Sequence, residues 1–168
     1  MRLRVVLGLF ALLATPMISG CGDEHDHEDH SAAEEACEHT KEGPFQDVTA
    51  TAAADGAPSA TFAHTAVRIT LVEDADDNTQ NSGYVTFAAD EATEFAFFLS
   101  VDVPMEIMDA NSATVEIEES ADVAECTEVA KQHNADLEVG TYTLKIGPTT
   151  ESMISLVVEE ASHEGEAH

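Results

Sequence analysis

The sequence predicts an all-β fold, an antiparallel, jelly-roll-like β-sandwich that follows a short helix and a disordered leash. Three observations predict it. Apolar residues alternate with polar ones in many short runs after residue 44, turn-forming residues separate these runs, and helical periodicity is nearly absent beyond that point. The 168-residue chain is long enough for one domain of ordinary size.

The N-terminal segment has the pattern of an export signal. Arg2 and Arg4 precede ten apolar residues, 5–14. Such a stretch would rise about 15 Å as a helix, half the roughly 30 Å of a bilayer core, so it suits a signal peptide better than a membrane span. Residues 18–21 (ISGC) follow, and they resemble the lipobox of bacterial lipoproteins, which ends in the acylated cysteine.

This resemblance implies that residues 1–20 are removed as a signal peptide and that Cys21 carries acyl chains such as palmitate. Two or more chains hold a protein durably on a membrane. Gly22 stands where an aspartate is a retention signal in several Gram-negative bacteria. We therefore expect a protein of the cell envelope that contacts the membrane through its lipid, on the outer membrane or facing the periplasm.

The mature chain is strongly acidic. All 34 acidic residues lie after position 20, against four basic ones, which leaves a formal charge of −30. The basic residues are Lys41, Arg68, Lys131 and Lys145. This charge repels phosphate backbones, which argues against a nucleic-acid partner, and it concentrates cations at the surface. Acidity that only keeps an exported protein soluble, or that reflects a salty habitat, explains the composition equally well.

Residues 21–31 are predicted to form a flexible, acidic, histidine-rich tether between lipid and domain. Within it, His25, His27 and His30 alternate with carboxylates (GDEHDHEDH, residues 22–30). Imidazole suits Zn and Cu, and the carboxylates add oxygen donors. Ordering so flexible a segment costs entropy, so we expect weak, labile binding of divalent cations. The alternative is a solvated spacer in which the histidines are incidental.

A short helix is predicted over residues 32–43. Ser31 and Glu34 have the spacing of a capping box, and Gly43 with Pro44 provides a stop.

The sandwich is predicted over residues 44–160, with a disordered tail at 161–168. Its strands are indicated by apolar residues at alternate positions. These are Val67/Ile69/Leu71, Val85/Phe87, Phe95/Phe97/Leu99/Val101, Met105/Ile107, Val115/Ile117, Tyr142/Leu144/Ile146 and Ile154/Leu156/Val158. Turns are predicted at 74–83, 90–93, 109–112 and 147–148. Residues 121–131 are the exception and could form one helical turn in a long connection.

Four stretches resemble the bacterial pre-peptidase C-terminal domain: 83–87 (GYVTF), 94–101 (EFAFFLSV), 105–110 (MEIMDA) and 137–144 (LEVGTYTL). That family alternates apolar strands with a D-A turn and an L-x-x-G-T-Y strand. The resemblance implies a jelly-roll-like sandwich. Members are accessory domains of secreted enzymes, so the resemblance implies a fold and assigns no activity.

With Cys21 acylated, Cys37 and Cys126 remain. In an oxidising compartment such a pair usually forms a disulfide, which here would contribute roughly 4–5 kcal/mol by the chain-entropy model. The alternative is a zinc site in which Cys37, His39, Cys126 and His133 form a Cys₂His₂ set. The spacing is not that of a zinc finger, and exported thiols seldom stay reduced, so the disulfide is favoured.

Residues 74–78 (DADDN) begin like a calcium-binding loop. Thr79 stands where that loop needs glycine, and Val85 stands where it needs a bidentate glutamate. The segment is therefore predicted to be a polar hairpin loop.

The sequence carries no nucleophile elbow, phosphate-binding loop or zincin motif, so we do not expect an enzyme. His64 and His133 are predicted to be hydrogen-bonded residues in or near strands. We expect a lipid-anchored, non-enzymatic protein that binds divalent metal weakly through its leash. The alternative is a protein- or glycan-binding sandwich, which needs an exposed apolar patch built from Phe98, Tyr84 and Tyr142.

Overall fold

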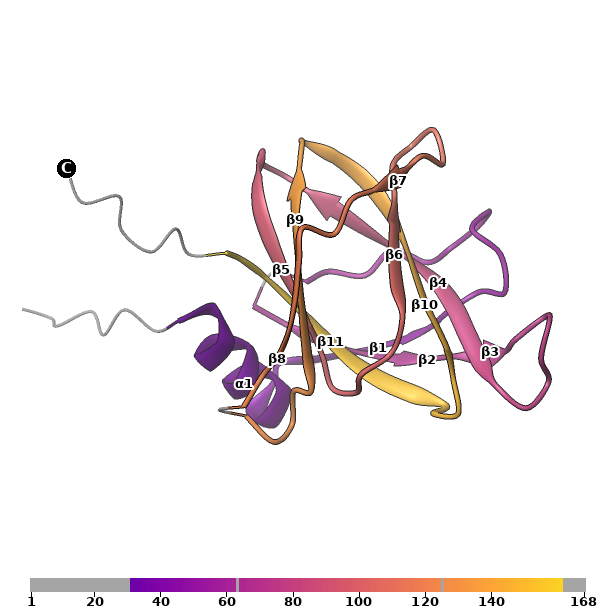
Figure 1. The fold of residues 1–168 in the computed structure, drawn as a ribbon, viewed down its shortest axis with the longest axis horizontal. Helices are drawn as coiled ribbons and strands as arrows, with labels where there is room; N and C mark the ends of the chain where they lie inside the picture. The colour runs from indigo at the N-terminus through magenta and orange to yellow at the C-terminus, as the bar shows by residue number, and fades with distance from the viewer. Residues whose placement is uncertain (1–30, 63, 125, 162–168) are drawn as a thin grey trace, which may run out of the picture.

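A computed structural model of the chain describes residues 31–62, 64–124 and 126–161. This part holds one helix and eleven strands, which form two sheets packed face to face (Figure 1). The predicted β-sandwich with a short N-terminal helix is confirmed. The predicted signal peptide, nearly all of the tether and the tail beyond residue 161 lie outside the described residues.

The first sheet has six strands, and its neighbours are antiparallel except for the first pair, which is parallel. In spatial order the strands are β1 (Phe45–Thr49), β2 (Ala66–Thr70), β11 (Met153–Glu160), β5 (Thr93–Leu99), β9 (Lys131–Leu137) and β8 (Glu119–Asp122).

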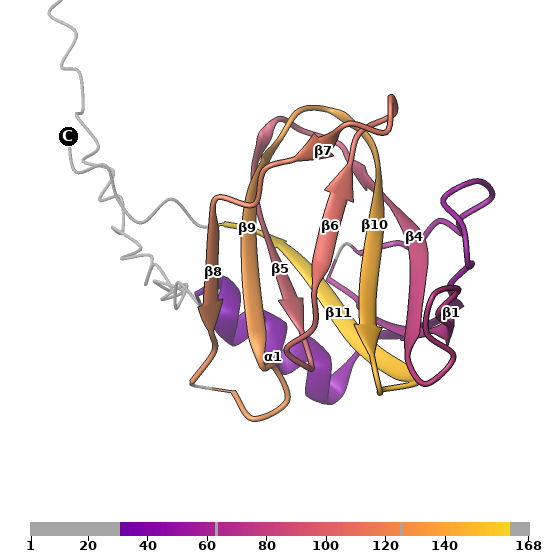
Figure 2. The same cartoon turned by 45° about the vertical axis from the view of Figure 1, so that its right-hand side comes forward.

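The second sheet has five strands and is antiparallel throughout. Figure 2 shows its middle strands side by side. In spatial order the strands are β3 (Val72–Glu73), β4 (Asn81–Ala89), β10 (Gly140–Thr149), β6 (Met105–Met108) and β7 (Thr114–Val115).

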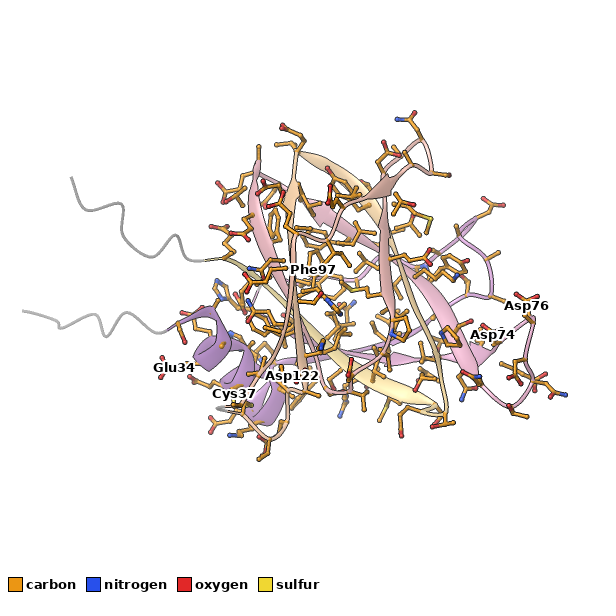
Figure 3. The ribbon with its side chains drawn as sticks, viewed as in Figure 1. Glu34, Cys37, Asp74, Asp76, Phe97 and Asp122 are labelled. Carbon is orange, nitrogen blue, oxygen red and sulfur yellow. A yellow bond between two sulfur atoms is a disulfide. The ribbon has the colours of Figure 1, made fainter. Side chains whose placement is uncertain are left out.

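The main core fills the space between the sheets, because alternate residues of each strand point inward. Phe97 lies near its centre and is fully buried (Figure 3). Phe87 packs edge-on against Phe62, Phe95 and Phe97, with ring centroids 5.2–5.7 Å apart. Most of the predicted inward residues lie in this cluster.

The outer face of the six-stranded sheet is also covered. The helix α1 (Ala32–Glu42) lies across it and buries Ala36 against Phe98 and Val157. Phe98 is therefore an interior residue and supplies no exposed patch. The sequence contains a sign of this second covering. Residues 156–158 (LVV) are all apolar, so β11 carries apolar side chains on both of its faces.

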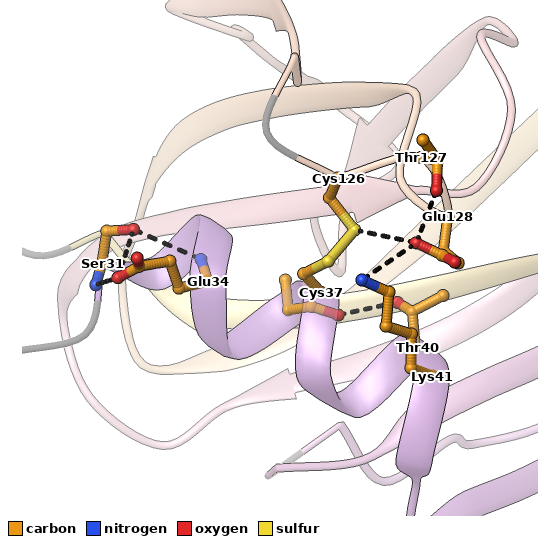
Figure 4. Close-up of a disulfide and its surroundings, with 9 residues drawn as sticks. Ser31, Glu34, Cys37, Thr40, Lys41, Cys126, Thr127 and Glu128 are labelled. Atoms are coloured by element: carbon orange, nitrogen blue, oxygen red, sulfur yellow. Dashed lines mark hydrogen bonds and ion pairs between the residues drawn. A yellow bond between two sulfur atoms is a disulfide. The ribbon is translucent and has the colours of Figure 1, made fainter.

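Both ends of α1 are fixed by local contacts, as predicted. The Ser31 hydroxyl accepts a hydrogen bond from the Glu34 amide, and the Glu34 carboxylate accepts one from the Ser31 amide (Figure 4). At the other end Gly43 adopts φ +79°, and its amide donates to the His39 carbonyl.

The predicted disulfide is present and joins α1 to the loop between β8 and β9. Cys37 and Cys126 are linked with an S–S distance of 2.06 Å, and Lys41 of the same helix pairs with Glu128 of that loop at 3.3 Å (Figure 4). The disulfide therefore holds the helix on the sheet.

Several segments differ from the prediction. The strands β1, β8 and β9 form where no strand is predicted, and Val101 and Ile117 lie just outside strands. Residues 121–131 form no helical turn in their described part, because β8 extends to Asp122 and β9 begins at Lys131. Residues 147–148 are not a turn between strands but an irregularity inside β10, where the register against β4 shifts after Ile146. Gly147 has φ +99°, and a Cβ there would lie 2.7 Å from the Asn81 carbonyl oxygen.

Candidate functional site at His39, His64 and Glu159

Two imidazoles and one buried carboxylate meet at the edge of the interface between α1 and the six-stranded sheet. His39 comes from the last turn of α1, His64 from the loop before β2, and Glu159 from the end of β11. One donor atom from each of the three lies within 4.8 Å of the others. The site thus joins segments that are 25 and 95 residues apart in the chain.

Strand register brings His64 to Glu159. In the antiparallel pair of β11 and β2, Leu156 lies opposite Val67 and Ser155 opposite Arg68. Continued by three residues, this register sets His64 opposite Glu159, although β2 itself begins only at Ala66. The resulting distance from His64 Nδ1 to Glu159 Oε2 is 4.0 Å.

His64 has a backbone conformation that non-glycine residues seldom adopt, with φ +45°. Its side chain is 76% exposed, while that of Glu159 is 7% exposed. The imidazole therefore covers the carboxylate from the solvent side.

The end of the helix orients the His39 ring. His39 Nδ1 lies 3.2 Å from the Gly43 carbonyl oxygen, which can only accept, so Nδ1 carries the proton. In the neutral ring Nε2 then presents its lone pair, 3.8 Å from Glu159 Oε1. A backbone hydrogen bond on one ring nitrogen is the usual way to fix the other nitrogen as a metal ligand.

Glu159 Oε1 is buried and receives no hydrogen bond. Burial raises the pKa of this carboxyl above its ordinary value, and the two histidines oppose that rise. Glu35 and Glu160 add to it through like charge. A buried carboxylate without a donor is unfavourable, and a proton or a bound cation would relieve it.

The three residues are spaced somewhat more widely than the ligands of an occupied metal site. Ligands about 2.0–2.2 Å from a tetrahedral zinc ion lie roughly 3.3 Å from one another. The distances of 3.8 Å to Oε1 and 4.0 Å to Oε2 end on different oxygens of Glu159, so side chains would rotate for all three residues to hold one ion. The carboxyl end of α1 also carries partial negative charge, which favours a cation.

The lysines and the arginine of the described residues have partners elsewhere. Lys41 pairs with Glu128, Arg68 with Asp47, Lys131 with Asp102 and Asp122, and Lys145 with Glu106. These side chains are therefore engaged away from Glu159, and the side chains that face its carboxylate oxygens are His39 and His64.

The alternative Cys₂His₂ zinc set is not assembled, and that prediction is corrected. The sulfurs of Cys37 and Cys126 are bonded to each other. His39 faces Glu159, while His133 lies on β9 with Nδ1 2.7 Å from the Ser120 hydroxyl. His133 is thus a hydrogen-bonded strand residue, as predicted, but it is buried on β9, which lies between β5 and β8 and is not the expected edge strand. His64 lies in a turn before β2.

The predicted hairpin loop at 74–83 is present but shorter, because it covers 74–80 and residues 81–83 already belong to β4. The Asp74 carboxylate accepts from the amides of Asp76 and Asp77, and the Asp77 carboxylate accepts from Thr79. The Ser82 side chain first, and then these amides, lower the pKa of Asp74, and the bonds from Thr79 lower that of Asp77. The carboxylates serve the turn itself.

Cys21, the predicted site of lipidation, and the histidines of the predicted leash, His25, His27 and His30, lie outside the described residues. In the part of the chain that is described, no helix combines the length and apolarity that crossing a bilayer requires.

Two of the three residues of the alternative, predicted binding patch are not exposed. Phe98 and Tyr142 are buried, and only Tyr84 is partly exposed. The large apolar side chains most exposed in the described ranges are Phe45, Val139 and Met153, which lie on different elements or loops.

Sequence reasoning named His39 and His64 but missed Glu159. The sequence feature that could have identified Glu159 is the apolar run 156–158. A strand that is apolar on both faces is normally covered on both faces. Glu159 continues the face of Val157, so burial beneath α1 could have been inferred. A scan against models of protein families and a search of curated proteins both find no match for this chain.

Proposed function

We propose that this chain is a lipid-anchored protein of the cell envelope that binds a divalent transition-metal ion through His39, His64 and Glu159. One observation carries the proposal. The buried Glu159 carboxylate has an imidazole nitrogen facing each oxygen, and Oε1 has no hydrogen-bond donor.

The donor set selects the class of metal. Two imidazoles and one carboxylate suit zinc or copper, whereas calcium takes six to eight oxygen ligands. Three protein ligands leave a fourth position of a tetrahedral ion for water or another molecule. The exposed side chain of His64 lets an ion enter from solvent.

The tether complements this site in the proposed function. The acyl chains on Cys21 hold the protein at the membrane, and His25, His27 and His30 gather metal weakly near its surface. The site under α1 then holds one ion more tightly, because its ligands are ordered before binding and lose less entropy.

Calorimetric titration of the full chain with Zn²⁺ tests the proposal. We expect a tight step and a weaker one. Glu159→Gln and His39→Ala should each weaken the tight step at least tenfold, because each removes a ligand. Replacing His25, His27 and His30 together by alanine should reduce only the weaker step.

Glu138→Gln is the matched control, because it removes one carboxylate from an exposed position and should leave the tight step unchanged. A tight step equally strong in wild type, Glu159→Gln and His39→Ala would refute the folded site. Equal heats from wild type and the triple histidine variant would remove the leash from the proposal.

A further inference from the structure

A cavity of about 680 Å³ opens beside the end of β11, and three consecutive residues of that strand, 158–160, line it. Its apolar walls include Phe62, Phe87 and Phe95, which belong to the aromatic cluster at this end of the core. The volume lies within the range of small-molecule sites, about 300–1,000 Å³.

Carboxylates surround the apolar part. Asp90 follows β4, Glu160 ends β11, and Glu35 comes from the first turn of α1. Glu160 shares a hydrogen bond with the carboxyl of Glu91, and this contact raises its pKa, with burial and the charges of Glu91 and Asp90 adding to the rise. These acids crowd one another, and His64 is the one histidine in the wall.

A second observation points to a ligand. Glu159 also lines this cavity; it is 7% exposed, and its Oε1 has no hydrogen-bond partner. The acidic wall thus includes a buried polar atom that a donor from a ligand could satisfy.

The cavity and the proposed metal site share two residues, His64 and Glu159, and they differ in His39. Side chains alternate along a strand, so the cavity meets β11 at Val158 and Glu160 on the face toward the sandwich core and at Glu159 on the face toward α1. His39 does not line the cavity. Replacing His39 should therefore weaken metal binding and leave the cavity unchanged.

We propose that this cavity binds a small organic ammonium ion with an apolar body, the body against the phenylalanine wall and the ammonium among Asp90, Glu159 and Glu160. The acidic wall disfavours anions. A metal ion alone would make no use of the apolar part of the cavity, and a neutral apolar molecule would leave the carboxylates uncompensated. Aromatic rings add attraction for the cation.

Calorimetry with 2-phenylethylammonium and the full chain, in the presence of a metal chelator, tests the proposal. Two matched probes separate its parts: 2-phenylethanol lacks the charge, and ethylammonium lacks the ring. Each should bind at least fivefold more weakly than the complete probe. Glu160→Gln should weaken the complete probe about fivefold, the size of one partly exposed ion pair.

Three further variants complete the test. Ser59→Trp should block the cavity from its exposed rim and remove binding, while Glu138→Gln should change nothing. His39→Ala should keep ammonium binding while it weakens zinc binding. The proposal is overturned if 2-phenylethanol binds as well as the amine, or if neither Glu160→Gln nor Ser59→Trp has an effect. Zinc binding without ammonium binding overturns this inference alone, and the reverse overturns the metal site alone.

Discussion

At Glu159 a carboxylate occupies a position that the rest of its strand face fills with apolar side chains. Phe98 and Val157 pack against Ala36 of α1 with little exposure, and Glu159 continues the strand face of Val157. An ionised carboxylate in this place loses its hydration, and its interaction with the imidazoles of His39 and His64 compensates for only part of that loss. The residue thus favours either a proton or a metal ion.

This environment predicts a pH dependence of stability in the absence of metal. The pKa of Glu159 is raised in the folded protein, so the folded state keeps its proton longer than the unfolded state does. Its unfavourable contribution is therefore absent below the ordinary carboxyl pKa, grows as the pH rises through the window between the unfolded and folded values, and is constant above it.

Glu159→Gln removes this contribution. Urea unfolding from pH 4 to pH 8 should show the variant gaining stability relative to wild type as the pH rises. Other carboxyls titrate over the same range, so the difference between the two proteins is the quantity to follow. A constant difference across the range would contradict the assigned environment.

The element that completes the proposed metal site is α1, and its position depends on three contacts. The capping box begins the helix, Gly43 ends it and orients the His39 ring, and the disulfide joins it to the β8–β9 loop. An isolated helix of 11 residues is marginal in water, so these contacts and the packing under it supply its stability.

The cap predicts a modest cost on substitution. Ser31→Ala removes the acceptor for the Glu34 amide and should lower the free energy of unfolding by about 1 kcal/mol, measured in urea. Ser31→Asp keeps an acceptor and should stay within about 0.5 kcal/mol of wild type. Equal losses in both variants would show that the hydroxyl does not act as a cap.

The disulfide predicts a larger cost. It joins residues separated by 89 positions, so it restricts a long loop of the unfolded chain. The double variant Cys37→Ala/Cys126→Ala should lose about 2–5 kcal/mol of unfolding free energy. Wild type unfolded in a reducing agent should lose a similar amount, and a loss below about 1 kcal/mol in both would contradict a stabilising role.

Over the whole molecule, charge repulsion is the dominant electrostatic feature. The sequence has 34 acidic residues against six basic ones, so carboxylates repel one another across the surface. One example is Glu118, whose pKa is raised first by Asp136 and then by burial and the nearby Glu94 and Glu116.

Salt should therefore stabilise the fold. The screening length falls from about 30 Å at 0.01 M to about 3 Å at 1 M ionic strength. At neutral pH the thermal unfolding midpoint should rise steadily as NaCl increases over that range. Potassium chloride should have the same effect at equal ionic strength, whereas a flat or falling midpoint would show that the repulsion is unimportant.

The sequence by itself determined the elements whose cause is local. Alternation such as Phe95, Phe97 and Leu99 identifies a strand because successive side chains face opposite sides, and Ser31 with Glu34 identifies the start of a helix because the cap lies within one turn. The disulfide also followed, since the predicted lipobox assigns Cys21 to the lipid and the two other cysteines are expected to pair in the oxidising compartment that it implies.

Only the tertiary structure decided which faces are covered and which distant side chains meet. The polar strands β8 and β9 form because neighbouring strands supply their partners, and nothing in their own composition marks them. Likewise, the side chains of His39, His64 and Glu159 meet because α1 crosses the outer face of the sheet near the end of β11. The chain that carries His64 lies just before the first residue of β2. Burial and register are properties of the packed sheets, so no local pattern contains them.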